Sequence, residues 1–170
     1  MPLYLRPVEM GRWLSPLTGG PASTSQTLVV GRVLLAQIVV PYACVIDGVI
    51  YCVGAASAGN VIGGLVGPIA RTADAPDGAP VVAQSASTAQ AAANTLQLLT
   101  WTAVSVQPGI YYAALEGDNA TGTVNRHGSA LQATGLYAQY DRSGGYGALT
   151  SPTPTTATGS SPAGLRLRIA

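Results

Sequence analysis

The chain has 170 residues, of which 48% are hydrophobic and only 9% are charged. The usual charged share is about 25%, so Ser, Thr, Gln, Gly and Ala must form most of the surface. Eight basic residues against seven acidic ones give a net charge of +1. With no run of like charge, this balance excludes the electrostatic footprint of a protein that binds nucleic acid or an anionic membrane. So few charges are unusual for a free monomer, and they predict a surface pressed against neighbouring proteins.

Residues 1–27 hold four prolines and show little regular periodicity. Proline donates no hydrogen bond to a sheet and disfavours helix, so we predict an extended N-terminal arm. Its order must come from its own domain or from a neighbouring subunit. Within the arm we predict that Tyr4, Trp13 and Leu14 contact a partner, with Trp13 as an anchor in a partner's pocket.

No signal peptide or membrane helix is expected. Residues 1–10 lack the apolar core of a secretory signal. The longest apolar stretch, residues 28–50, is interrupted by polar side chains and a proline, whereas a membrane helix needs roughly 20 apolar residues in succession. We therefore expect a soluble protein.

From residue 28 onward, short apolar runs separated by turns predict strands. These runs cover residues 28–41, 43–54, 61–70, 81–85, 94–106, 110–116, about 121–125, 131–140 and 165–169. In the first run both alternating faces are apolar except at Arg32 and Gln37, as is typical of a strand covered on two sides. In residues 94–106 the even-numbered face is the more apolar. The Ala-rich residues 87–93 favour a helix by propensity but are too few to form one alone.

This pattern predicts an all-β fold, a single antiparallel β-sandwich of jelly-roll type over residues 28–170. Within it, residues 143–164 form a long connection rich in Gly, Ser, Thr and Pro. The pair Gly63-Gly64 indicates a bulge or a close backbone approach in its strand.

Asp47-Gly48 leaves an ambiguity between one strand and a hairpin over residues 43–54. Cys44 and Cys52 are the only thiols. In a single strand they lie eight steps of about 3.3 Å apart, and in a hairpin they are diagonal neighbours. Neither geometry favours a disulfide, so we predict two buried, reduced thiols.

No residue pattern predicts catalysis, a metal or a cofactor. His127 is the only histidine, which leaves zinc ligation and a serine–histidine–acid triad without support. Four of the seven acids come in two pairs, Asp74 with Asp77 and Glu116 with Asp118. Such pairs serve glycosidases or calcium sites, but turn-forming aspartates are far more common, and we predict turns here. We predict that the chain is not an enzyme and needs no cofactor.

Three tyrosines flank a glycine-rich stretch near the C-terminal end: Tyr137, Tyr140 and Tyr146. They fit either a platform that stacks on sugars or packing in a core or an interface, and packing is the favoured interpretation.

Four segments carry a resemblance to a known family. They are Val-Pro-Tyr-Ala-Cys-Val-Ile-Asp-Gly-Val at residues 40–49, Ala-Ala-Ser-Ala-Gly-Asn at residues 55–60, Pro-Gly-Ile-Tyr-Tyr-Ala-Ala-Leu at residues 108–115, and the closing strand at residues 165–169. The chain resembles a β-sandwich module of tailed-bacteriophage virion proteins, whose members are head decoration proteins, head fibres and tail-fibre tips. The resemblance implies a single strand over residues 43–54.

The resemblance also implies a function. Because the chain lacks a coiled-coil or triple-helix shaft, we expect a compact part bound directly to a capsid or tail. The expected role is a decoration or cement protein on the virion's capsid surface. Its partners would be the major capsid protein or another virion protein and copies of itself, as a homotrimer. The alternative is a carbohydrate-binding adhesion module at a fibre or tail tip, using Tyr137, Tyr140 and Tyr146.

Overall fold

The computed structural model describes residues 13–14, 24–69, 78–126, 137–141, 145–151 and 164–170. The strands are β1 (Trp13–Leu14), β2 (Thr24–Thr27), β3 (Arg32–Val40), β4 (Cys44–Cys52), β5 (Asn60–Ile69), β6 (Val81–Gln84), β7 (Thr88–Ala89), β8 (Leu96–Val106), β9 (Gly109–Gly117), β10 (Thr123–Arg126), β11 (Tyr137–Asp141) and β12 (Arg166–Ile169). None of the described residues is helical, so no helix among them is long and apolar enough to cross a membrane.

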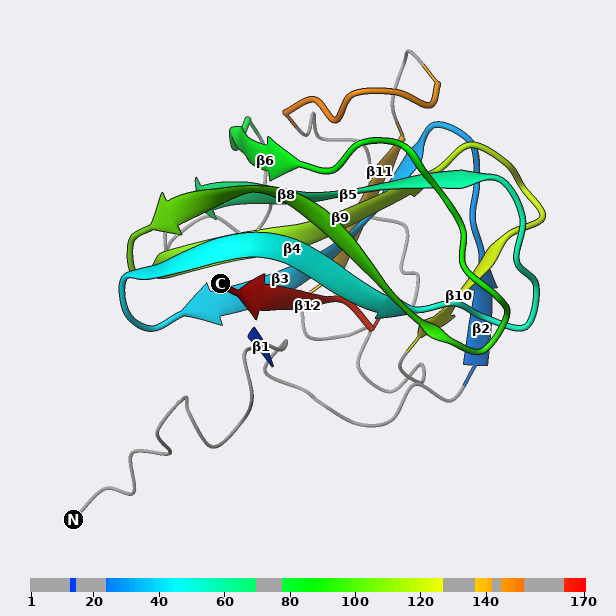
Figure 1. Ribbon diagram of the computed structural model, residues 1–170. Helices are drawn as coiled ribbons and strands as arrows, with labels where there is room; N and C mark the ends of the chain where they lie inside the picture. Colours follow the sequence, from blue (N-terminus) through cyan, green and yellow to red (C-terminus); the bar gives the residue numbers. More distant parts are fainter. Residues whose placement is uncertain (1–12, 15–23, 70–77, 127–136, 142–144, 152–163) are drawn as a thin grey trace.

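The strands form an antiparallel β-sandwich, which confirms the predicted fold class. One sheet has the order β1-β12-β4-β8, and the other has the order β11-β3-β9-β5-β6 with β7 also paired to β5. A small third sheet joins β10 to β2. Figure 1 shows β12, β4 and β8 side by side in the nearer layer, with β3, β9 and β5 behind them.

The main core lies between the two large sheets. Its fully buried side chains include Ile38 and Leu115 from one sheet and Val49, Leu99 and Leu167 from the other. In β12, Leu167 alternates with Arg166 and Arg168, which are more exposed, as the pleat of a half-buried strand requires. The period-two pattern at the end of the chain therefore predicted β12 correctly.

A second apolar cluster covers the other face of the larger sheet. Leu35, Ile62 and Tyr112 point to this side and pack with Leu149 and Tyr146 from the 145–151 segment. Consequently β3 is buried at most positions on both faces, which confirms the prediction made from its two apolar faces.

Residues 44–52 form one strand, not a hairpin, and Asp47 marks a bulge in it. The pairing of β4 with β8 shifts between Ile46 and Gly48, and β12 shifts at the same place. Arg168 of β12 donates two hydrogen bonds of 2.6 Å to the Asp47 carboxylate. The dipeptide Asp47-Gly48, which is typical of a turn, thus forms an irregularity within one strand.

The same irregularity decides which face of β8 points into the core. The even-numbered face is more apolar, yet Gln97 and Leu99 are the buried residues in its first half, and Val106 is buried at its end. Leu96, the first residue of the even set, is 70% exposed. The inward face changes from odd to even across residues 101–103 of β8, which lie opposite the single residue Asp47 of β4, so a simple alternation does not identify the core face.

Two other segments resolve choices that the sequence left open. The Ala-rich residues 87–93 form β7 and a turn, with no helix. Gly63 and Gly64 mark a close approach: a Cβ on Gly63 would overlap Val49 Cγ1 of the facing sheet, and one on Gly64 would overlap Leu149 Cδ1 on the other side. The ladder between β5 and β9 runs regularly through both glycines.

Part of the predicted N-terminal arm pairs with its own chain. Trp13 and Leu14 lie opposite Arg168 and Leu167, which makes β1 an edge strand beside β12. Residues 24–27 pair with β10. These strands attach the described parts of the arm to the sandwich, whereas Tyr4 lies outside the described residues.

Candidate interaction surface

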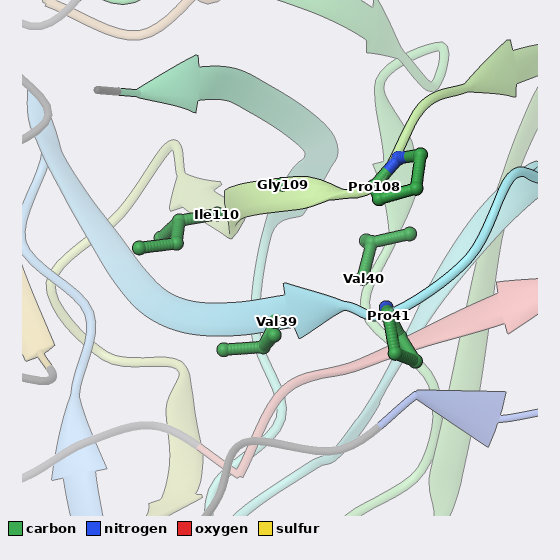
Figure 2. A pocket seen from close by; sticks show the side chains of 6 residues that line it. All are labelled: Val39, Val40, Pro41, Pro108, Gly109 and Ile110. Atoms are coloured by element: carbon green, nitrogen blue, oxygen red, sulfur yellow. The ribbon is translucent and has the colours of Figure 1, made fainter. Parts of the chain in front are cut away.

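An apolar hollow lies at the end of the sandwich where β3 finishes and β9 begins. Its volume is about 310 Å³, and it is lined by Val39, Val40, Pro41, Pro108, Gly109 and Ile110. Val39 pairs with Ile110, and Val40 pairs with Gly109, so the hollow covers the last two steps of this ladder. Figure 2 shows the two prolines beyond Val40 and Gly109, where the strands leave the sheet.

The sequence fixes this shape through proline. Pro41 follows the last residue of β3, and Pro108 immediately precedes the first residue of β9. Each proline ring holds its backbone torsion and removes an amide donor, so neither position extends the ladder. The Tyr111 hydroxyl donates a 3.1 Å hydrogen bond to the Gln107 carbonyl and closes the turn before β9. The walls of the hollow are therefore preformed.

The lining limits what the hollow can do chemically. Its six residues carry no acidic, basic, hydroxyl or thiol side chain. Such walls offer a bound group no side-chain hydrogen bond, but they can bury an apolar side chain of another protein. Val39 is 38% exposed and contributes apolar surface that a partner would cover.

The acid pair Glu116 and Asp118 does not converge on a cleft. Glu116 is fully buried at the end of β9. The Asp118 carboxylate accepts hydrogen bonds from the Asn60 amide, the Asn60 side chain and the Asn119 side chain. The hydrogen bond from the Asn119 side chain, followed by those from Asn60, lowers the pKa of Asp118 below its ordinary value. Asp118 thus organises the turn after β9, as predicted.

Of the three tyrosines, Tyr146 has a described side chain and it is used in packing. Its hydroxyl lies 2.6 Å from Ser87 Oγ, and its ring packs against the second apolar cluster. Burial raises the pKa of Tyr146. Tyr137 and Tyr140 lie on β11, opposite Ala36 and Val33 of β3. Backbone pairing places them on a strand at the edge of the larger sheet.

Several candidate residues have simple outcomes. Cys44 and Cys52 are free thiols, each half-buried. Asp74, Asp77 and His127 lie outside the described residues, as do most of residues 143–164. Across the described ranges, no three side chains of His, Cys, Asp or Glu gather as a metal site would require. Trp13 and Leu14 are placed by their backbone pairing alone.

The hollow was not predicted from the sequence, although its lining residues lie in segments that the sequence analysis singled out. Val40-Pro41 and Pro108-Gly109-Ile110 open two of the segments that carry the family resemblance. A proline after one strand and a proline before another form a hollow only if the two strands are neighbours, and the pairing of β3 with β9 is not visible in the sequence. Comparison with known proteins adds no family, because no family model and no curated protein matches the chain.

Proposed function

We propose that the chain is a structural protein of a tailed-bacteriophage virion, and that it decorates and cements the head surface. The observation that carries this proposal is the preformed apolar hollow of Val39, Pro41, Pro108 and Ile110. A site without polar side chains favours protein contact over catalysis or recognition of a polar small molecule. The low charge of the chain and its resemblance to virion modules point to the same role.

The proposed mechanism is physical. Binding to assembled capsomers but not to free subunits stabilises the shell by mass action. The partner is the major capsid protein or another virion protein, and the chain binds as a symmetric oligomer, a homotrimer. In this role a partner's apolar side chain fills the hollow, whose prolines reduce the conformational entropy lost on binding.

The test compares purified heads stripped of this protein with heads to which it has been added back. Heads carrying the protein should release their contents at a higher temperature. Val39→Asp should abolish the gain because it places a charge in the hollow, whereas Val30→Asp, at another exposed valine, should preserve it. Equal heat resistance of stripped and decorated heads would refute cementing.

A further inference from the structure

The outward face of the smaller sheet carries a second apolar surface. Register places Leu98 opposite Ile50 and Leu96 opposite Cys52. These four residues, called here the outer patch, alternate with Gln97, Leu99, Val49 and Tyr51, which point into the core. The pleat therefore turns all four outward on neighbouring strands.

Within the outer patch Leu96 is exposed, whereas Leu98, Ile50 and Cys52 are half-buried. Leu98 Cδ1 lies over Gly48, where an added Cβ would be 3.2 Å from it. Leu96 is 70% exposed, more than any other large hydrophobic residue in the described parts of the chain. An exposed leucine alone is ordinary, but one that continues into three apolar neighbours on adjacent strands indicates a binding surface.

A cation borders this patch. Arg166 of β12 lies directly opposite Ile50 in the register, so the row across the sheet reads Leu98, Ile50, Arg166. The Arg166 side chain is exposed. The nearby carboxylate of Asp47 is already bound by Arg168 through two short hydrogen bonds. The face thus presents leucine and isoleucine beside a guanidinium whose neighbouring acid is engaged.

We infer that the outer patch and Arg166 form a docking site for a protein surface that presents apolar side chains next to a carboxylate. Charge complementarity selects this occupant, because an uncharged apolar patch would leave the guanidinium without a partner on binding. A second copy docked by the same face would bring another guanidinium, and its Asp47 carboxylate is already bound by its own Arg168. The inference rests on the proposed function, since the partner is a protein of the virion.

The experiment measures binding of the full-length chain to stripped heads as a function of protein and salt concentration. Leu96→Ser should weaken binding about tenfold, because most of that side chain is free to be buried on docking. Its control is Val30→Ser at the turn between β2 and β3, where Val30 is 48% exposed. That control should bind like wild type, and both variants should keep the wild-type melting temperature.

The charge is tested separately. Arg166→Gln should weaken binding about threefold at low salt and flatten its dependence on salt, as expected for a charge at the rim of an interface. Thr121→Glu, in an exposed loop, changes the net charge by the same amount and should leave the salt dependence unchanged.

The outcomes separate the two proposals. If wild type fails to bind stripped heads, the proposed function falls and this inference falls with it. If wild type binds but Leu96→Ser and Arg166→Gln bind equally well, only the docking site is refuted. If light scattering shows that Leu96→Ser dissociates an oligomer of the purified chain, the patch is a contact between copies, which also overturns the inference.

Discussion

Replacing Gly63 with alanine should destabilise the sandwich, because this glycine sets how closely the two sheets approach. The added methyl would overlap Val49 Cγ1 and lie 2.9 Å from Leu99 Cδ1. Val49 and Leu99 are fully buried in the core between the sheets. Valine is β-branched and stiff, so it cannot turn away cheaply.

The expected magnitude combines two opposing effects. Overpacking a core costs about 1–3 kcal/mol. Removing glycine's freedom in the unfolded chain returns about 0.4–1 kcal/mol. The net loss is then about 1–2 kcal/mol, which for a chain of this size lowers the melting temperature by roughly 2–8 °C. Gly64→Ala should cost less, since the atom it meets is the terminal methyl of Leu149.

Urea unfolding followed by circular dichroism measures this difference. The control is Gly109→Ala, where the nearest atom would be 3.4 Å from the new Cβ, and its midpoint should stay close to that of wild type. Combining Gly63→Ala with Val49→Ala should cost at least about 0.5 kcal/mol less than the sum of the single changes, because the second change makes room for the first. A Gly63→Ala protein as stable as wild type would refute the close approach.

Three further predictions follow from polar and thiol groups. Asp118→Asn should lower stability near neutral pH. Because the pKa of Asp118 is lowered in the folded state, the stability advantage of wild type should disappear as the pH falls through that pKa. A difference in urea midpoint that does not change with pH would contradict this expectation. In urea unfolding, Tyr51→Phe should lower the free energy of unfolding by about 1 kcal/mol and Gln97→Leu by about 2–3 kcal/mol. The Gln97 side chain makes hydrogen bonds to two backbone groups as well as to the Tyr51 hydroxyl, so its loss removes more bonds. Equal losses for the two variants would refute this hydrogen-bond network. When the chain is denatured without a reducing agent, a thiol-alkylating reagent should add one group each to Cys44 and Cys52, as measured by mass spectrometry. In the folded state, burial raises the pKa of Cys44 and should slow its alkylation. Fewer than two added groups after denaturation would show a disulfide.

The sequence predicted the features that depend on local chemistry. Two apolar faces identified β3 as a strand covered on both sides. The adjacent glycines of β5 indicated a bulge or a close approach, and the structure has the close approach at these positions. The more apolar even face of β8 does not face the core in the first half of the strand, because the inward side reverses across residues 101–103, which lie opposite the single residue Asp47 of β4. Simple alternation does not show where a strand holds extra residues. The hollow escaped prediction for a different reason, since it requires knowing that β3 and β9 are neighbours.

The two apolar surfaces lie toward opposite ends of β4 and β8. The hollow is at the end where β3 leads into β4, and the outer patch contains Cys52 and Leu96 at the other end of that strand pair. The eight steps of β4 span about 26 Å at about 3.3 Å each. If the hollow and the outer patch both dock other proteins, as proposed, the chain can contact two neighbours at once. Cementing requires two such contacts, whereas attachment to a single neighbour requires only one.

This arrangement separates occupancy from cementing. At saturating concentration, Leu96→Ser should still occupy stripped heads through the hollow, because the changed residue lies on the outer patch. It should nevertheless raise the temperature at which the heads release their contents by less than wild type does, since one of the two bridging contacts is weakened. Quantitative gel analysis of sedimented heads gives the occupancy, and a dye that reports released DNA gives the temperature. Full protection by Leu96→Ser at wild-type occupancy would show that the outer patch takes no part in bridging.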